Sequence, residues 1–185
     1  MSKQTIDESL PQTVLLDGSS PLSSDEVEAL LQRLGIASST ISHEPMRTVE
    51  DSKKYRDGVP GGYSKNLFLR NKKGKMWLVT LHEDRLIDLR DLGSAIGAGR
   101  VSFASSERLM QYLGVIPGAV TPLAVANDKS GQVQLVIDQQ LMQIEPLHFH
   151  PCDNSKTTTL KAEDLLRFLD NCDHTPHLID FDALD

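Results

Sequence analysis

Apolar residues recur at helical spacing in several parts of the chain. Positions 27, 30, 31 and 34 are Val or Leu and fall on one face of a helix. Ser23 and Glu26 have the spacing of a capping box, and Gly35 is typical of a helix stop. The pattern therefore predicts a first helix from Ser23 to Leu34. Similar signals predict a helix from Thr48 to about Arg56, one with Leu89, Leu92 and Ile96, one with Leu109, Met110 and Leu113, and a final one with Leu165, Leu166 and Leu169.

Short β-rich runs lie between these helices. Residues 65–71 and 75–81 flank Lys72-Lys73-Gly74 and predict a β-hairpin, whose mostly apolar second run is expected at the centre of a sheet. A second hairpin is expected from residues 123–126 and 133–137. The remaining expected strands are 40–43, 85–88, 100–103 and 147–150. Polar residues 154–159 are expected to form a loop, and residues 178–185 a short acidic tail.

Two hairpins interrupt any strict alternation of strands and helices. The chain is therefore expected to form an α+β fold, with a mixed, mostly antiparallel, curved sheet of about seven strands surrounded by helices. Residues 21–185 are assigned to this single domain. Residues 1–20 are polar and aperiodic and are expected to form an extension.

Composition narrows the cellular setting. The 185 residues contain no apolar run near the roughly 18 residues that a membrane span needs, and the polar N-terminus lacks the apolar segment of a signal peptide. Cys152 and Cys172 form neither a metal-binding spacing nor a disulfide framework. We therefore expect a cytoplasmic protein with no membrane partner, no metal and no cofactor.

Charge is distributed unevenly. The net charge of −7 argues against non-specific binding to nucleic acid. The segment from Asp51 to Lys75 nevertheless has eight basic and two acidic residues, a local charge of +6. It is interpreted either as a solvated charged face or as a footprint for phosphate groups.

The stretch Leu113–Pro122 contains two glycines and two prolines in ten residues. A stiff loop of this composition can present bare backbone N–H groups to a carbonyl oxygen or a developing oxyanion. The alternative is an ordinary turn between a helix that ends at Gly114 and a strand that begins near Leu123.

Four segments, taken together, resemble the YbaK-type aminoacyl-tRNA editing domains, and most closely the free-standing prolyl-tRNA editing branch of that family. The resemblance covers roughly residues 22–180, and the segments occur in the expected order. They are Gly61-Gly62-Tyr63-Ser64-Lys65-Asn66-Leu67-Phe68-Leu69, Gly97-Ala98-Gly99-Arg100-Val101-Ser102-Phe103, Gly114-Val115-Ile116-Pro117-Gly118 with Thr121-Pro122, and Phe149-His150-Pro151 with Asn154 and Thr157.

The resemblance implies hydrolysis of alanine wrongly esterified to proline tRNA. A synthetase pocket for proline cannot fully exclude a smaller side chain, so a second, smaller sieve is needed. The implied mechanism uses water and the free hydroxyl of the terminal ribose, without metal. The implied partner is the acceptor end of the tRNA, with prolyl-tRNA synthetase or an elongation factor as further partners. Two alternatives stay open: a deacylase for another residue, such as Cys or Ser, and a catalytically silent module that binds tRNA or the synthetase.

The resemblance also implies roles for particular residues. Lys65 would hold the terminal phosphate or ribose, and His150 and Gly118 would complete the catalytic set. The expected substrate-binding residues are Asn66, Arg100, Gly114, Val115, Ile116, Pro117, Ala119, Phe149 and Asn154. Arg100 would add a positive group near the acceptor end, the loop amides would bind the aminoacyl group, and Phe149 would limit its size. The competing interpretations are a surface lysine, a structural histidine at a strand end and a loop-capping asparagine. Cys152 is interpreted as incidental, because no specific activating group accompanies it.

Overall fold

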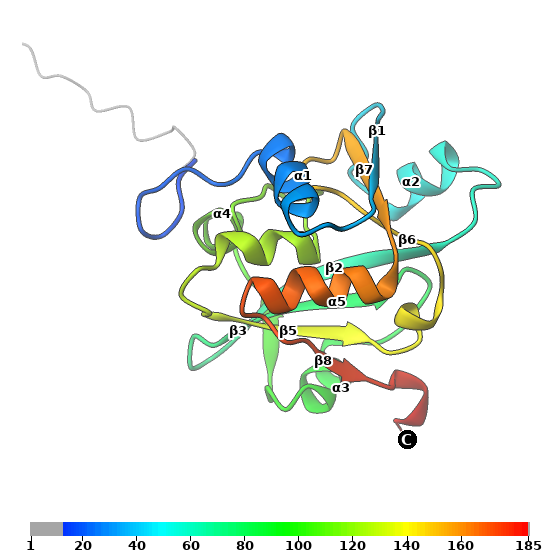
Figure 1. Cartoon of the computed structure of the whole chain (residues 1–185). Helices are drawn as coiled ribbons and strands as arrows, with labels where there is room; N and C mark the ends of the chain where they lie inside the picture. The colour runs from blue at the N-terminus through cyan, green and yellow to red at the C-terminus, as the bar shows by residue number, and fades with distance from the viewer. Residues whose placement is uncertain (1–12, 185) are drawn as a thin grey trace, which may run out of the picture.

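A long antiparallel hairpin, β2 (Gly62–Asn71) and β3 (Met76–His82), forms the centre of the fold. The computed structural model describes residues 13–184 and is shown in Figure 1. The other strands are β1 (Ser39–Ser42), β4 (Val101–Phe103), β5 (Val133–Asp138), β6 (Leu147–Phe149), β7 (Lys156–Leu160) and β8 (His177–Ile179). The helices are α1 (Ser24–Arg33), α2 (Val49–Tyr55), α3 (Leu89–Ala95), α4 (Ser106–Leu113) and α5 (Ala162–Asn171), with 3-10 turns η1 (Pro122–Asn127), η2 (Leu141–Gln143) and η3 (Phe181–Ala183).

The eight strands form one mixed sheet in the order β1-β7-β6-β2-β3-β5-β8, and β4 pairs with the far end of β2. Four of the seven pairings are antiparallel, and three are parallel. Strand β2 meets β6 through Gly62 and Tyr63 and meets β4 only from Leu69 onward. Within the described sheet, the β2 edge from Ser64 to Phe68 therefore has no strand beside it on that side.

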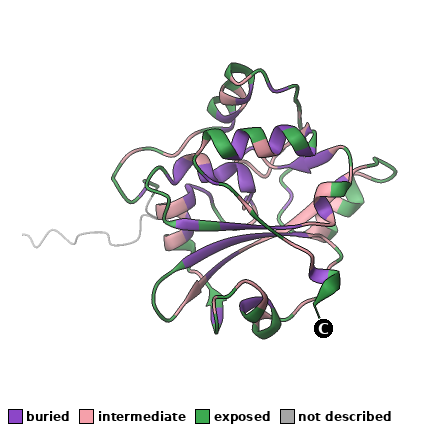
Figure 2. Ribbon diagram, turned by 60° about the horizontal axis from the view of Figure 1, so that its bottom comes forward, coloured by how far each residue is buried: buried purple, intermediate pink, exposed green. Residues whose placement is uncertain are grey.

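Alternation along the hairpin divides the core into two layers. Phe68, Met76 and Leu78 belong to one cluster, which α1, α4 and α5 cover. Leu69, Trp77 and Val79 point to the other face and pack with residues around α3 and η3. Figure 2 shows the buried ribbon of the central strands with elements on both sides. Strand β3 thus lies at the centre of the sheet, as predicted, and its residues are apolar because both of its faces are buried.

The helix caps follow the sequence signals. The capping box of Ser23 and Glu26 opens α1, and a second one, from Thr48 and Asp51, opens α2. Helix α2 contains no buried residue. Two ion pairs connect the helix and its C-terminal cap to the residues after β3: Lys53 pairs with Asp84, and Arg56 pairs with Glu83.

Several expected elements were wrong, although the α+β class and the mixed, mostly antiparallel sheet are confirmed. Residues 122–127 form η1 rather than a hairpin strand, because Pro122 stands in the first turn and the Thr121 hydroxyl accepts a hydrogen bond from the N–H of Leu123. Strand β5 instead pairs in parallel with β3. Residues 85–88 form no strand. The expected acidic tail contains β8, which pairs with β5, and η3.

The expected polar loop at residues 154–159 is largely strand β7. Its threonines are β-branched and suit a pleated sheet, and Thr158 is fully buried between β1 and β6. The Thr158 hydroxyl shares a hydrogen bond of 2.8 Å with the Thr40 hydroxyl.

Part of the expected N-terminal extension lies outside the described residues. Of the part that is described, Leu15 is buried, and the N–H of Leu16 donates to the carbonyl of Gln111 at 2.8 Å. No helix among residues 13–184 is long and apolar enough to cross a membrane.

Candidate active site

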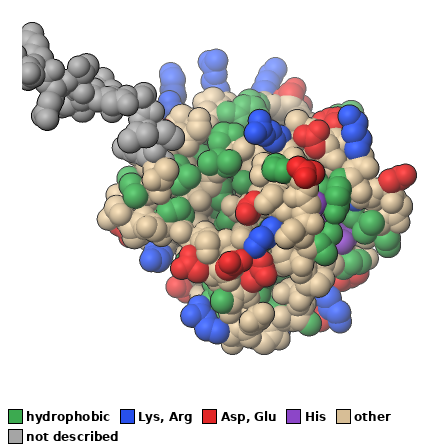
Figure 3. Space-filling model, turned by 90° about the horizontal axis from the view of Figure 1, so that it is seen from above, with side chains coloured by type: hydrophobic (Ala, Val, Ile, Leu, Met, Phe, Trp, Pro, Cys, Tyr) green, Lys and Arg blue, Asp and Glu red, His purple; other side chains and the backbone are tan. Residues whose placement is uncertain are grey.

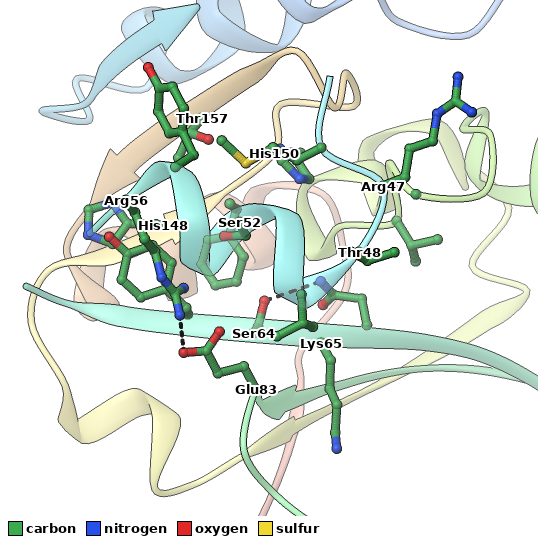
Figure 4. A pocket seen from close by; sticks show the side chains of 18 of the residues that line it. Arg47, Thr48, Ser52, Arg56, Ser64, Lys65, Glu83, His148, His150 and Thr157 are labelled. Carbon is green, nitrogen blue, oxygen red and sulfur yellow. Dashed lines mark hydrogen bonds and ion pairs between the residues drawn. The ribbon is translucent and has the colours of Figure 1, made fainter. Parts of the chain in front are cut away.

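A cavity of about 340 Å³ opens where α2 lies over the start of β2. Its walls also come from β6, β7 and the loop after α4, so they bring together parts of the chain that lie far apart in sequence. Figure 4 shows the side chains that line it. The residues are Ile41, Met46, Arg47, Thr48, Val49, Ser52, Tyr55, Arg56, Val59, Tyr63, Ser64, Lys65, Asn66, Glu83, Gly118, Val120, His148, Phe149, His150, Thr157 and Thr159.

Five of the site residues predicted from sequence line this cavity: Lys65, Asn66, Gly118, Phe149 and His150. Asn154 adjoins it. The Nδ2 atom of Asn154 lies 3.5 Å from the position that a Cβ of Gly118 would occupy. The carbonyl of Asn154 also accepts a hydrogen bond from the N–H of Met46 at 2.9 Å, which fixes the wall around Met46. Three of the four sequence motifs therefore meet at one place.

The remaining predicted residues do not line the cavity. Arg100 is exposed and directly precedes β4, at the opposite end of β2 from Ser64 and Asn66. Gly114 forms the left-handed cap of α4 and donates its N–H to the carbonyl of Met110. The N–H of Ala119 is also used, since it donates to the carbonyl of Ile116. Val115 is buried in the core, whereas Ile116 and Pro117 are exposed.

Together with Val120, Gly118 brings this loop to the wall of the cavity. The φ of Gly118, +89°, lies in the region that favours glycine. An added Cβ would lie 3.3 Å from the Cα of Arg47, so the loop and the segment before α2 approach each other closely here. The N–H of Gly118 donates no hydrogen bond to any residue in the described part of the chain.

Lys65 stands between two hollows. Its backbone and the base of its side chain belong to the cavity, but Figure 4 shows the side chain pointing away from it. The Nζ atom donates a hydrogen bond to the carbonyl of Arg85. Lys65 also lines a neighbouring hollow with Leu86, Asp88 and Phe181. In this conformation the amino group of Lys65 is bound to the carbonyl of Arg85, outside the cavity.

A short polar chain fixes the amide of Asn66. The buried Thr80 hydroxyl donates to Oδ1 of Asn66 at 2.8 Å, and Nδ2 of Asn66 donates to the hydroxyl of Ser64 at 3.2 Å. Ser64 and Asn66 alternate with Lys65 along β2, so both face the cavity. This chain leaves one Nδ2 hydrogen and the Ser64 O–H for a ligand.

His150 presents a free basic nitrogen to the cavity. Its Nδ1 carries the proton, because it hydrogen-bonds to the carbonyl of Lys156 at 2.7 Å and a carbonyl can only accept. Burial lowers the pKa of His150, against the opposing effect of that hydrogen bond. The ring is therefore neutral at neutral pH. Its Nε2 atom holds a lone pair and accepts no hydrogen bond from residues 13–184.

Another wall of the cavity is formed by a stack of side chains that the sequence did not reveal. The rings of Tyr63 and His148 stack with centroids 4.5 Å apart, and the guanidinium carbon of Arg56 lies 3.4 Å from the centroid of Tyr63. Arg56 also pairs with Glu83, and both side chains are almost buried. Burial lowers the pKa of His148, whose Nε2–H donates to the carbonyl of Pro60 at 3.0 Å.

One signal for the stack was present in the sequence. His148 precedes His150 by two residues, so a strand places both on one face. No local signal existed for Arg56 and Glu83, which lie 27 residues apart. His43 uses both ring nitrogens in hydrogen bonds, with the carbonyl of Glu44 and the hydroxyl of Thr157.

The cysteine beside the site is not activated. Burial raises the pKa of Cys152 to about 12, so its thiol is protonated at neutral pH. In the described part of the chain, no group of three or more His, Cys, Asp or Glu side chains is placed to hold a metal ion.

Comparison with known proteins gives a consistent result. Residues 43–168 match the family described as "Aminoacyl-tRNA editing domain". The chain is 41% identical over 140 residues to the prolyl-tRNA editing protein ProX of Acetoanaerobium sticklandii, covering 75% of this chain and 85% of that protein. It is 37% identical over 159 residues to the prolyl-tRNA synthetase associated domain-containing protein 1 of Danio rerio, covering 85% and 86%.

The fold is also found among solved structures. The crystal structure of a candidate trans-editing enzyme for prolyl-tRNA synthetase superposes with a TM-score of 0.66 at 17% identity, covering 86% of this chain and 97% of that one. At this level of identity the likeness concerns the fold alone.

Proposed function

The chain belongs to the aminoacyl-tRNA editing domain family, and from this premise we propose that it is a trans-editing deacylase that hydrolyses alanine from mischarged proline tRNA. The observation that carries the proposal is the meeting of Asn66, Gly118 and His150 in one cavity. The relative named for prolyl-tRNA editing supports proline tRNA as the substrate.

The proposed reaction is the hydrolysis of one ester bond. Water adds to the ester carbonyl carbon, the bond from that carbon to the ribose oxygen breaks, and a proton from water ends on the ribose oxygen. The products are free alanine and tRNA with a free terminal hydroxyl. The neighbouring ribose hydroxyl helps to orient the water, so the protein mainly supplies position and electrostatic stabilisation.

Each residue of the site has a proposed part in this step. The free N–H of Gly118 would donate to the carbonyl oxygen as negative charge develops there. The lone pair on Nε2 of His150 would accept a hydrogen bond from the water or the ribose hydroxyl. The ordered amide of Asn66 would bind the ribose, and Lys65, after leaving the Arg85 carbonyl, would bind the terminal phosphate.

Apolar walls in the cavity support the proposal of a small aminoacyl group. Phe149 and Val120 are apolar, and the backbone of Arg47 lies against Gly118. A wall of this kind can exclude a larger ring by steric contact, whereas a pocket for proline cannot exclude alanine.

The decisive experiment is single-turnover deacylation of proline tRNA charged with Ala, Cys, Ser or Pro, with and without prior treatment with EDTA. We expect the fastest hydrolysis for the Ala ester, little for the Pro ester, and no effect of EDTA. Preference for the Cys or Ser ester would assign the chain to another specificity. Tight tRNA binding without hydrolysis of any ester would show a silent binding module, and chelator-sensitive activity restored by zinc would overturn the mechanism.

A further inference from the structure

Glu83 is the one carboxylate among the described residues that line the cavity. The other charged lining residues are Arg47, Arg56 and Lys65, which are all cations. Lys65 directs its amino group away from the cavity, to the carbonyl of Arg85, so Arg56 is the cation that meets Glu83 there. As the one carboxylate among these lining residues, Glu83 is the place in this cavity where a cation is favoured.

The sheet fixes the backbone of Glu83 at the wall of the cavity. Glu83 follows β3 directly and continues the hairpin, since its N–H donates to the carbonyl of Tyr63 at 3.0 Å. The preceding pair, His82 and Ser64, is in register across β2 and β3. Glu83 therefore lies opposite Tyr63 on the neighbouring strand. The next residue of that strand, Ser64, faces the cavity with its hydroxyl. Figure 4 shows the carboxylate of Glu83 directed toward Arg56.

The hydrogen bonding of this carboxylate is incomplete. The side chain of Glu83 is only 9% exposed, and Oε1 accepts a hydrogen bond from Nη2 of Arg56. The other oxygen, Oε2, accepts none from residues 13–184. On the partner side, Nη1 of Arg56 is buried and donates to no group in the described part of the chain. The buried, unpaired Nη1 of Arg56 makes this ion pair less stabilising, and Oε2 of Glu83 is left to accept a hydrogen bond from a ligand.

An aminoacyl ester carries a feature that matches this site. Its α-amino group is bonded to the carbon next to the ester carbonyl and is largely protonated near neutral pH, with an ordinary pKa near 8. We propose that Oε2 of Glu83 binds this α-ammonium group and restricts the enzyme to esters with a free amino group. This inference rests on the function proposed above. Esters with a blocked amino group, such as peptidyl esters, would lose the contact.

The test compares two esters of the same tRNA in single-turnover reactions. One carries alanine, and the other carries lactate, in which a hydroxyl replaces the ammonium at the same position. The quantity of interest is the ratio of the two values of kcat/KM, compared between wild type and variant so that the intrinsic difference in ester reactivity cancels. Glu83→Gln should lower this ratio about tenfold or more, because a hydrogen bond to a charged group is lost from the alanine ester alone.

Two further variants test whether the fall in the ratio comes from the carboxylate of Glu83 itself. Asp84→Asn removes the same charge one residue away, from an exposed carboxylate that does not line the cavity, and should leave the ratio unchanged. The double variant Arg56→Gln, Glu83→Gln removes the ion pair without leaving an unpaired buried cation. It should show the same fall in the ratio even if the single variant folds poorly.

The outcomes separate this inference from its premise. An unchanged ratio in folded Glu83→Gln and in the double variant would overturn the role of Glu83 while leaving the deacylase intact. An equal fall in Asp84→Asn would overturn it too, because the effect would be one of general charge. Failure of the wild type to hydrolyse any aminoacyl ester would overturn the proposed function, and this inference with it.

Discussion

The Nε2 atom of His148 occupies space that any side chain at Gly61 would need. A Cβ built on Gly61 would lie 2.4 Å from that atom and 2.6 Å from the carbonyl of Pro146, and the φ of Gly61 is +136°. The same ring nitrogen donates to the carbonyl of Pro60. The glycine therefore lets the loop before β2 close over His148.

Gly61→Ala should destabilise the fold by at least about 1 kcal/mol and displace His148. The reasons are the strained φ and the clash with His148 and the carbonyl of Pro146. Urea denaturation measures the loss. Gly58→Ala is the matched control, because Gly58 has a φ of +77° and no atom within 4 Å of an added Cβ. Equal losses in the two variants would mean that the contact with His148 contributes nothing.

Lys65→Ala should reduce deacylation of the alanine ester about tenfold to over a hundredfold while the protein stays folded. The reason is the loss of one charge-assisted contact to the terminal phosphate or ribose. Single-turnover kinetics and a thermal melt give the two readouts, with Lys129→Ala, at an exposed loop lysine outside the basic segment 51–75, as the control. Wild-type turnover in folded Lys65→Ala would remove this lysine from the mechanism.

Gly118→Val should impair the chemical step more than tRNA binding. A branched side chain at a φ of +89°, against the Cα of Arg47, would shift the backbone that presents the free N–H. A donor of this type is worth roughly 2.7–4 kcal/mol in the transition state and little in the ground state, so the saturating single-turnover rate should fall about a hundredfold or more. The rate is measured across tRNA concentration. A loss of affinity alone would show that Gly118 belongs to the tRNA-binding surface.

Neutralising Lys72, Lys73 and Lys75 together should impair tRNA binding more than the chemical step. These lysines are exposed at the turn between β2 and β3, roughly 23 Å along the strand from Lys65. Figure 3 shows basic and acidic side chains interspersed on the surface seen from above, so local clusters rather than the net charge are expected to matter. The triple alanine variant should bind tRNA more weakly and with a smaller salt dependence. A lower saturating rate with unchanged affinity would contradict this assignment.

The stability contributed by His174 should fall as pH rises. Burial opposes protonation, but hydrogen bonds from its ring to Asp128 at 2.9 Å and to the carbonyl of Cys172 at 2.6 Å raise the pKa of His174 above its ordinary value of 6.5. The charged ring therefore stabilises the fold fully below pH 6.5, and this stabilisation is lost as pH rises through the higher pKa of the folded state.

Urea denaturation of wild type and His174→Gln between pH 5.5 and pH 8.5 checks this. The difference in the free energy of unfolding should be largest at the acid end and shrink above pH 6.5. His177→Gln, at an exposed histidine nearby, is the control for the substitution itself. A difference that stays constant across the range would mean that His174 contributes through packing alone.

The central hairpin could be predicted from sequence because its information is local. The apolar run of β3, the lysine-glycine turn and the alternation of β2 lie within 21 consecutive residues, from Gly62 to His82. The second expected hairpin was wrong because the partner of β5 is β3, more than 50 residues earlier, and local sequence does not record such a pairing. Residues 128–131 do form a turn, in which the N–H of Gly131 donates to the carbonyl of Asp128, but residues 122–127 before it form a 3-10 helix.

The candidate site was predictable to a similar extent. Lys65, Asn66, Gly118 and His150 belong to motifs whose order resembles that of a known family, and the structure brings them together. Arg100 also belongs to such a motif, yet β4 joins the far end of β2 and holds it away. Arg56 and Glu83 meet only through the placement of α2 over the end of β3, which no spacing in the sequence encodes.

Successive side chains of β2 point to opposite faces of the sheet, and this limits which insertions the strand can accept. One added residue between Asn66 and Phe68 would exchange the two faces downstream, sending Phe68 and Leu69 into each other's core layers while Ser64 and Asn66 stayed in place. Insertions in this strand should therefore prevent the protein from folding. The exposed turn at Lys72-Lys73-Gly74, by contrast, can accept peptide tags or longer loops, which makes it the natural position for a reporter sequence.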